Sequence, residues 1–219
     1  MNDQLILKFP NHQAYKKEDF YVSPSNLEAY DFINSWPKWI KRIINIYGPS
    51  GSGKSHLASI LKNKTSCIKI NSDQLNEKIF LEFKTKESMI IENLNEKVSE
   101  KLLFSLWNVA LQDNKYLLIT SIKPITLYKF KLPDLVSRVS SILIIGINLP
   151  SDDLISAILA KNFSDKQISV DKKHIDYIIK RIDRSYEKIS QFILTLDKYS
   201  LKKGSPFSLK LIKEVLKMI

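Results

Sequence analysis

A glycine-rich stretch of eight residues constrains the fold of this chain most. Residues 48–55 read Gly-Pro-Ser-Gly-Ser-Gly-Lys-Ser, which has the spacing G-x-x-x-x-G-K-S. The apolar run at 43–47 precedes it, and the helix-favouring stretch 56–61 follows it. A strand, a glycine loop and a helix in this order let successive backbone N–H groups point at one anion near a helix N-terminus. The sequence therefore predicts a phosphate-binding loop whose ligand is ATP or ADP.

The residue types within the loop indicate separate roles. The residues expected to contact the nucleotide here are Gly48, Pro49, Ser50, Gly51, Ser52, Gly53, Lys54, Ser55 and His56. Lys54 is placed for the β- and γ-phosphates, where it also assists catalysis, and the Ser55 hydroxyl is placed for Mg²⁺. The alternative is a glycine–serine turn that only starts a helix.

The rest of the chain predicts an α/β architecture. Strands are expected at 43–47, 66–71, 89–91, 117–120 and 142–147, with helical patterns between them, such as the leucine-rich stretch 96–112. This alternation predicts a parallel five-stranded sheet flanked by helices. The remaining helices are expected at 152–163, 171–182, 185–199 and 208–219, which together predict a small all-helical C-terminal lid. We therefore divide the chain into an arm at 1–10, a nucleotide-binding domain at 11–150 and a lid subdomain at 151–219.

The composition indicates which partners and which cellular compartment to expect for the protein. The formal net charge is +11, and nearly all of the 34 basic residues are lysines. A solvated surface and a weak, nonspecific contact with DNA both explain that charge. The single cysteine, Cys67, and an N-terminus without a basic–apolar leader favour the cytoplasm. No apolar run approaches the ~20 residues that span a bilayer, so no membrane partner is expected.

The remaining candidate catalytic and metal-binding residues lie at the ends of the predicted strands. An α/β nucleotide domain followed by a small helical lid is the layout of the AAA+ ATPases. In that layout Glu92 is expected to hold Mg²⁺ through a water, and Thr120 to orient the attacking water or to contact the γ-phosphate. Asn93 stands where the carboxylate that activates water is expected, and an amide cannot accept a proton. We therefore expect nucleotide to bind well and to be hydrolysed slowly; chance polar residues at strand ends are the alternative.

Nearly the whole chain resembles the DnaA-type AAA+ family, and most closely its short branch Hda in the alphaproteobacterial form. The stretches that carry the resemblance are 20–26, 47–57, 132–138, 181–186 and 196–197. The resemblance implies that Tyr21 and Val22 contact adenine and that Arg184 of the lid contacts the nucleotide. It also implies that Arg138, within Leu-Pro-Asp-Leu-Val-Ser-Arg, is an arginine finger acting on a neighbour's triphosphate. A surface ion pair is the alternative for Arg138.

The N-terminal arm resembles a clamp-binding motif of the same branch. Residues 4–9 read Gln-Leu-Ile-Leu-Lys-Phe. Leu5, Leu7 and Phe9 suit an apolar cleft, and Gln4 suits a hydrogen bond at its edge. An edge strand or a core segment is the alternative.

The resemblance implies a regulator that docks on the DNA polymerase sliding clamp and promotes hydrolysis of DnaA-bound ATP. Because the sequence ends at Ile219 without a helix-turn-helix domain, we expect no sequence-specific origin binding. A nucleotide-binding assembly factor without catalytic effect, and a stand-alone ATPase such as a helicase loader, remain alternatives. The preference between ADP and ATP and the formation of a homo-oligomer stay open.

Overall fold

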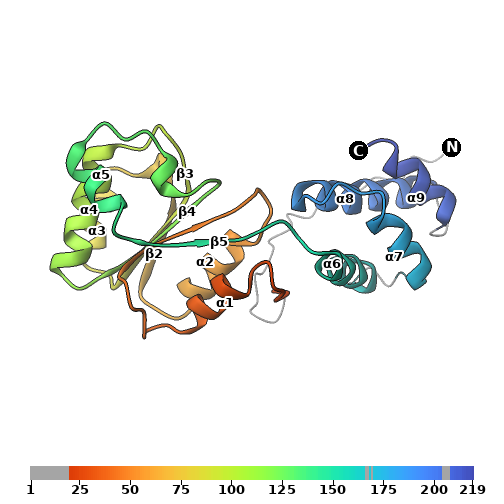
Figure 1. Cartoon of the computed structure of the whole chain (residues 1–219), viewed down its shortest axis with the longest axis horizontal. Helices are drawn as coiled ribbons and strands as arrows, with labels where there is room; N and C mark the ends of the chain where they lie inside the picture. The colour runs from red at the N-terminus through yellow and green to blue at the C-terminus, as the bar shows by residue number, and fades with distance from the viewer. Residues whose placement is uncertain (1–19, 166–167, 169, 204–207) are drawn as a thin grey trace.

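The computed structural model describes residues 20–165, 168, 170–203 and 208–219. Figure 1 shows a twisted sheet with helices on both faces at one end of the molecule and a group of helices at the other end. Within residues 20–165, the chain passes from the sheet to these helices after the last strand, where it enters α6 (Asp152–Asp165).

Five parallel strands form the sheet. They are β1 (Ile43–Tyr47), β2 (Cys67–Asn71), β3 (Ser88–Leu94), β4 (Tyr116–Ser121) and β5 (Leu143–Gly146). Their order is β2-β3-β4-β1-β5, so β1 lies between β4 and β5. In register, Tyr47 faces Ser121 on one side and Gly146 on the other. The carboxyl ends of the three strands therefore meet at one edge, where open α/β sheets bind their ligands.

Alternate side chains of the strands pack into two separate hydrophobic cores, one on each face of the sheet. Ile43 of β1 packs into one core, whereas its neighbour Ile44 packs into the other. Met89 and Ile91 of β3 likewise face the first core, and Ile90 faces the second. Side chains of a strand alternate between faces, so a strand buried on both faces reads as a continuous apolar run. This is the physical reason that β3 carries the continuous apolar run Met89–Ile91 and β4 the run Tyr116–Ile119.

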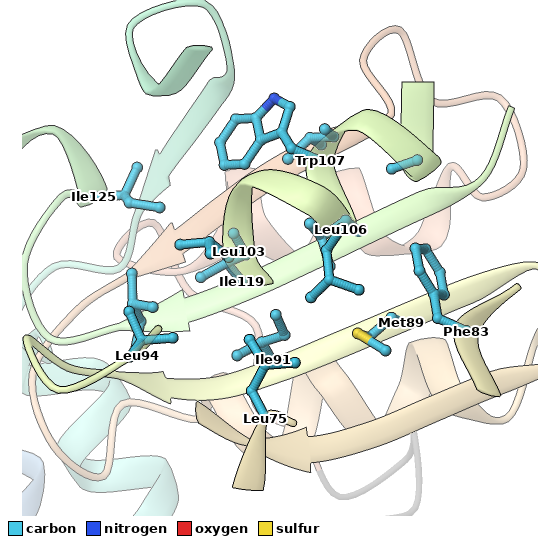
Figure 2. Close-up of a cluster of buried hydrophobic side chains, with 14 of the residues drawn as sticks. Leu75, Phe83, Met89, Ile91, Leu94, Leu103, Leu106, Trp107, Ile119 and Ile125 are labelled. Carbon is cyan, nitrogen blue, oxygen red and sulfur yellow. The ribbon is translucent and has the colours of Figure 1, made fainter. Parts of the chain in front are cut away.

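Helices cover both faces of the sheet. Those on the first face are α3 (Glu77–Phe83), α4 (Glu100–Gln112) and α5 (Pro133–Val139); those on the second are α1 (Leu27–Asn34) and α2 (Lys54–Lys62). Figure 2 shows α4 lying over the first face, with Leu103, Leu106 and Trp107 above Ile91 and Ile119. Burying a side chain of this size is worth about 1.5–3 kcal/mol relative to exposing it, so α4 anchors this face.

The C-terminal helices have a core of their own. The helices after α6 are α7 (Lys172–Ile179), α8 (Tyr186–Lys203) and α9 (Leu209–Leu216). Leu159 of α6, Ile178 of α7, Phe192 of α8 and Ile212 of α9 are fully buried against one another. The predicted fold class, a five-stranded parallel α/β sheet followed by an all-helical lid, is therefore confirmed.

Most boundaries differ from the sequence prediction by a few residues, and two of the differences have a clear local reason. The helix predicted at 96–112 is α4, and it begins at Glu100 instead of residue 96. The Ser99 side chain caps it by accepting a hydrogen bond from the Leu102 N–H. The third strand continues past Ile91 to Leu94 through a shift in register against β4. That shift places Asn93 in the left-handed region at φ 55°.

Among the described residues, no helix combines the length and the apolar character that crossing a membrane requires.

Candidate functional site

The predicted phosphate loop connects β1 to α2 at the edge where β1, β4 and β5 end. The Gly48 N–H donates to the Ser121 carbonyl of β4 at 3.1 Å. A Cβ on Gly48 would lie 2.8 Å from the Ile147 carbonyl oxygen just after β5. The loop therefore leaves the sheet through a gap that only glycine fits, and it ends at the N-terminus of α2.

Two glycines give the loop its curl. Gly51 has φ +76° and Gly53 has φ +91°, a region that residues with a side chain rarely adopt. A Cβ on Gly51 would lie 3.0 Å from Tyr186 Cβ, at the start of α8. The loop thus touches the lid at Gly51 and enters α2 directly after Gly53.

Lys54 is the buried cation of the loop. Its side chain is folded over the loop, where Nζ donates to the carbonyls of Gly48 at 2.8 Å and Pro49 at 2.7 Å. Burial lowers the pKa of Lys54 to about 8, and the nearby Glu92 carboxylate opposes part of that shift. A phosphate group bound at the loop would place a negative charge beside this buried ammonium group and would favour its charged form.

A cavity of about 700 Å³ lies between the phosphate loop and the lid. Its lining from the loop and α2 consists of Ser50, Gly51, Ser52, Gly53, Lys54, Ser55 and His56. Tyr21, Asn93 and Ile122 add to this side, and the lid contributes Ile158, Lys161, Asn162, Asp165 and Ser190. The volume is in the range of small-molecule and cofactor sites.

Glu92 and Ser55 are the two residues predicted to supply oxygen donors to a magnesium ion. The Ser55 residue lines the cavity, and Glu92 Oε1 is a buried oxygen without a hydrogen-bond partner. Hydroxyl and carboxylate oxygens are donors that suit Mg²⁺. The other carboxylate oxygen, Oε2, lies 2.9 Å from Lys69 Nζ. The donor types therefore fit the metal, with half of the carboxylate already engaged by a lysine.

Asn93 and Thr120 lie together at the ends of β3 and β4. The Asn93 N–H donates to Thr120 Oγ1 at 3.2 Å, and Asn93 Nδ2 donates to Asn71 Oδ1 at 2.7 Å. Asn93 lines the cavity, whereas Thr120 is buried beneath it at 1% exposure. Thr120 therefore holds the backbone of Asn93 in this structure, and its predicted contact with water stays a prediction.

The remaining predicted residues lie away from the cavity lining. Arg138 is partly buried near the end of α5, with its guanidinium 5.7 Å from the centre of the Phe104 ring. Arg184 pairs with Asp152 at 3.0 Å and is mostly exposed. Val22 is also exposed, next to the cavity-lining Tyr21. Their functional roles stay predictions.

The four residues of the predicted clamp-binding motif, Gln4, Leu5, Leu7 and Phe9, lie outside the described residues.

Sequence reasoning missed the lid side of the cavity. Ile158, Lys161, Asn162 and Asp165 follow one another at helical spacing and line the cavity from one face of α6. That spacing was visible in the sequence, but nothing in it indicates which face of a helix turns toward a ligand.

Phe20 was also missed as a support of the loop. Its ring stacks on Tyr30 with centroids 5.5 Å apart, and it meets the edge of His56 at 5.2 Å. This single ring connects α1 to the start of α2.

Comparisons with known proteins agree with this geometry. No family model matches the chain. The chromosomal replication initiator protein DnaA of Campylobacter jejuni is 26% identical over 235 residues, covering 93% of this chain and 52% of that protein. The chain thus spans about half the length of the curated relatives it matches.

Solved structures of DnaA share the fold. Domain III of Thermotoga maritima DnaA matches with a TM-score of 0.78 and 21% identity, over 95% of this chain and 98% of that one. AMPPCP-bound DnaA from Aquifex aeolicus matches with a TM-score of 0.71 and 18% identity, over 84% and 65%. The chain is therefore homologous to the AAA+ domain of DnaA, as its sequence predicted. Its closeness to the Hda branch stays a prediction.

Proposed function

We propose that this protein binds ATP or ADP in the cavity beside the phosphate loop. The observation that carries the proposal is the loop itself, which wraps the buried Lys54 ammonium at the N-terminus of α2. Backbone N–H groups, a helix N-terminus and a buried cation all favour a phosphate group. The AMPPCP bound to the Aquifex aeolicus DnaA, an analogue of ATP, supports the same ligand class.

The residues around the cavity favour binding over turnover. Asn93 lines the cavity at the end of β3, and its amide cannot act as a general base. The loss of general-base help typically lowers a rate by about 10²–10⁴. Ser55 and the unpartnered oxygen of Glu92 would hold Mg²⁺ where it accompanies the nucleotide, and the ion would neutralise phosphate charge. We therefore propose that the protein keeps its nucleotide bound and, by itself, hydrolyses ATP slowly.

Homology to DnaA supports a role in the initiation of DNA replication. Arg138 is absent from the described lining of the protein's own cavity. Its guanidinium, near the end of α5, would therefore not contact the protein's own nucleotide. Such a group suits the binding of a triphosphate on a neighbouring molecule. We propose that Arg138 reaches the ATP of DnaA and promotes its hydrolysis, which lowers initiation.

The arm and the basic surface would bring the two proteins together. In this proposal Gln4, Leu5, Leu7 and Phe9 bind the sliding clamp on DNA, in the cytoplasm. The net charge of +11 adds a weak, nonspecific contact with DNA that weakens as salt rises.

Single-turnover hydrolysis of DnaA-bound ATP tests this function. DnaA loaded with labelled ATP is mixed with clamp-loaded DNA, with and without the protein, and the conversion to ADP is followed. The proposal predicts faster conversion with the protein present. A Gln4→Ala, Leu5→Ala double variant should lose the effect on clamp-loaded DNA and should no longer be retained by the clamp in a pull-down.

The alternatives predict other results in the same assay. A nucleotide-binding assembly factor would bind DnaA and leave its ATP intact. A stand-alone ATPase or helicase loader would release phosphate without DnaA and would be insensitive to the double variant. Either result would replace the proposed function.

A further inference from the structure

A lysine on β2 contacts the site where a magnesium ion is expected. Lys69 Nζ lies 2.9 Å from Glu92 Oε2. It also donates to Ser59 Oγ at 3.1 Å and to the Ser55 carbonyl at 3.4 Å. Lys69 therefore joins the end of β3 to the first turns of α2, directly beside the phosphate loop.

The pair is largely shielded from water. The Lys69 side chain is 18% exposed and the Glu92 side chain 12%. A charged pair in such a place is held by its mutual attraction and hydrogen bonds, because neither charge is well solvated alone. Glu92 can therefore offer a second cation only Oε1, because releasing Oε2 from Lys69 carries a cost that an exposed carboxylate would not have.

Glu92 already faces two ammonium groups. Lys69 contacts it directly, and the charge of Glu92 also acts on the ammonium of Lys54. One carboxylate cannot neutralise two ammonium groups and a divalent ion at once. Before a nucleotide is bound, a magnesium ion beside Ser55 would meet more positive than negative charge, whereas a phosphate group would meet an attractive field.

We propose that Lys69 is the resident cation that engages Glu92 Oε2, so that nucleotide binding depends little on Mg²⁺. This inference rests on the proposed nucleotide binding and concerns the metal dependence of the same site. Lys69 is a positioning residue here, because it acts through Glu92.

Binding of ADP measured by calorimetry, with magnesium and with EDTA in its place, tests the inference. We expect magnesium to change the dissociation constant of the wild type less than about threefold, and to tighten binding to Lys69→Met by about tenfold or more, as changes beside metal ligands do. Lys69→Arg keeps the charge and should behave like the wild type. Lys62→Met removes a charge at the exposed end of α2 and should also leave the magnesium response unchanged.

A double variant guards against misfolding. Lys69→Met leaves a buried carboxylate unpaired, whereas Lys69→Met with Glu92→Gln removes both charges and keeps the shapes similar. The double variant should bind ADP and lose the magnesium response that Lys69→Met gains, which assigns that response to the freed Glu92.

The outcomes separate this inference from the proposed function. A wild type that binds ADP only with magnesium, or a Lys69→Met variant that binds with the same response as the wild type, would overturn the role of Lys69 alone. Absence of ADP binding to the wild type in both conditions would overturn the nucleotide site and the inference with it.

Discussion

Gly53 lies against the ring of Phe20, so close that a Cβ on the glycine would be 2.8 Å from Phe20 Cε2. Gly53 also has φ +91°, and α2 begins at the next residue. The entry of the phosphate loop into its helix therefore depends on a residue without a side chain, held under an aromatic ring.

Gly53→Ala should destabilise the protein and weaken ADP binding. Both the positive φ and the contact with Phe20 oppose a methyl group, and strain of this kind costs about 1–3 kcal/mol. Thermal unfolding and ADP titration measure the two effects. Phe20→Leu with Gly53→Ala relieves the contact and keeps the backbone strain, so it should recover only part of the loss. A Gly53→Ala variant that unfolds and binds like the wild type would refute the loop geometry.

Asn93→Asp should raise the protein's own ATP hydrolysis by about tenfold or more, because a carboxylate at this position can act as a general base. The backbone at φ 55° tolerates aspartate as well as asparagine. Steady-state phosphate release measures the change. Asn95→Asp adds the same charge two residues along, outside the described cavity lining, and should leave the rate unchanged. Equal rates for the wild type and Asn93→Asp would show that the missing carboxylate does not limit turnover.

Arg138→Ala should remove the stimulation of DnaA-bound ATP hydrolysis, a loss of about 10³-fold if Arg138 acts as an arginine finger. Its own ADP affinity should not change, because Arg138 lies outside the described lining of the cavity. Arg138→Lys should also be impaired, since it loses the planar fork of donors. Arg181→Ala, in which the arginine removed lies over Tyr177 in the lid, is the control. Full stimulation by Arg138→Ala would exclude this residue as the finger.

ADP affinity without magnesium should fall as pH rises above about 8. Burial places the pKa of Lys54 at about 8, and a bound phosphate favours its charged form, so binding raises that pKa. The affinity contributed by the charge is therefore fully present below pH 8 and declines above it, by up to about tenfold per pH unit. Calorimetry in buffers of different ionisation enthalpy should show proton uptake in the declining range. An affinity independent of pH without proton uptake would contradict this assignment.

The sheet and the loop were predictable from sequence, because buried strands and phosphate loops leave strong local signals. The run at 43–47 became β1 without a shift, and the glycine spacing predicted the turn before Lys54. The lid side of the cavity was not predictable: Lys161 and Asn162 read as ordinary positions of a helix. The Lys69–Glu92 pair was not predictable from sequence either, because it depends on how β2 and β3 align beside α2.

Calorimetric titration of ADP into the wild type and into Lys54→Ala tests the central claim most directly. The account predicts uptake of one nucleotide per chain by the wild type. It also predicts an affinity at least about tenfold lower for Lys54→Ala, because a charge-assisted hydrogen bond to phosphate is lost. Absence of uptake by the wild type, or equal affinities for the two proteins, would contradict it.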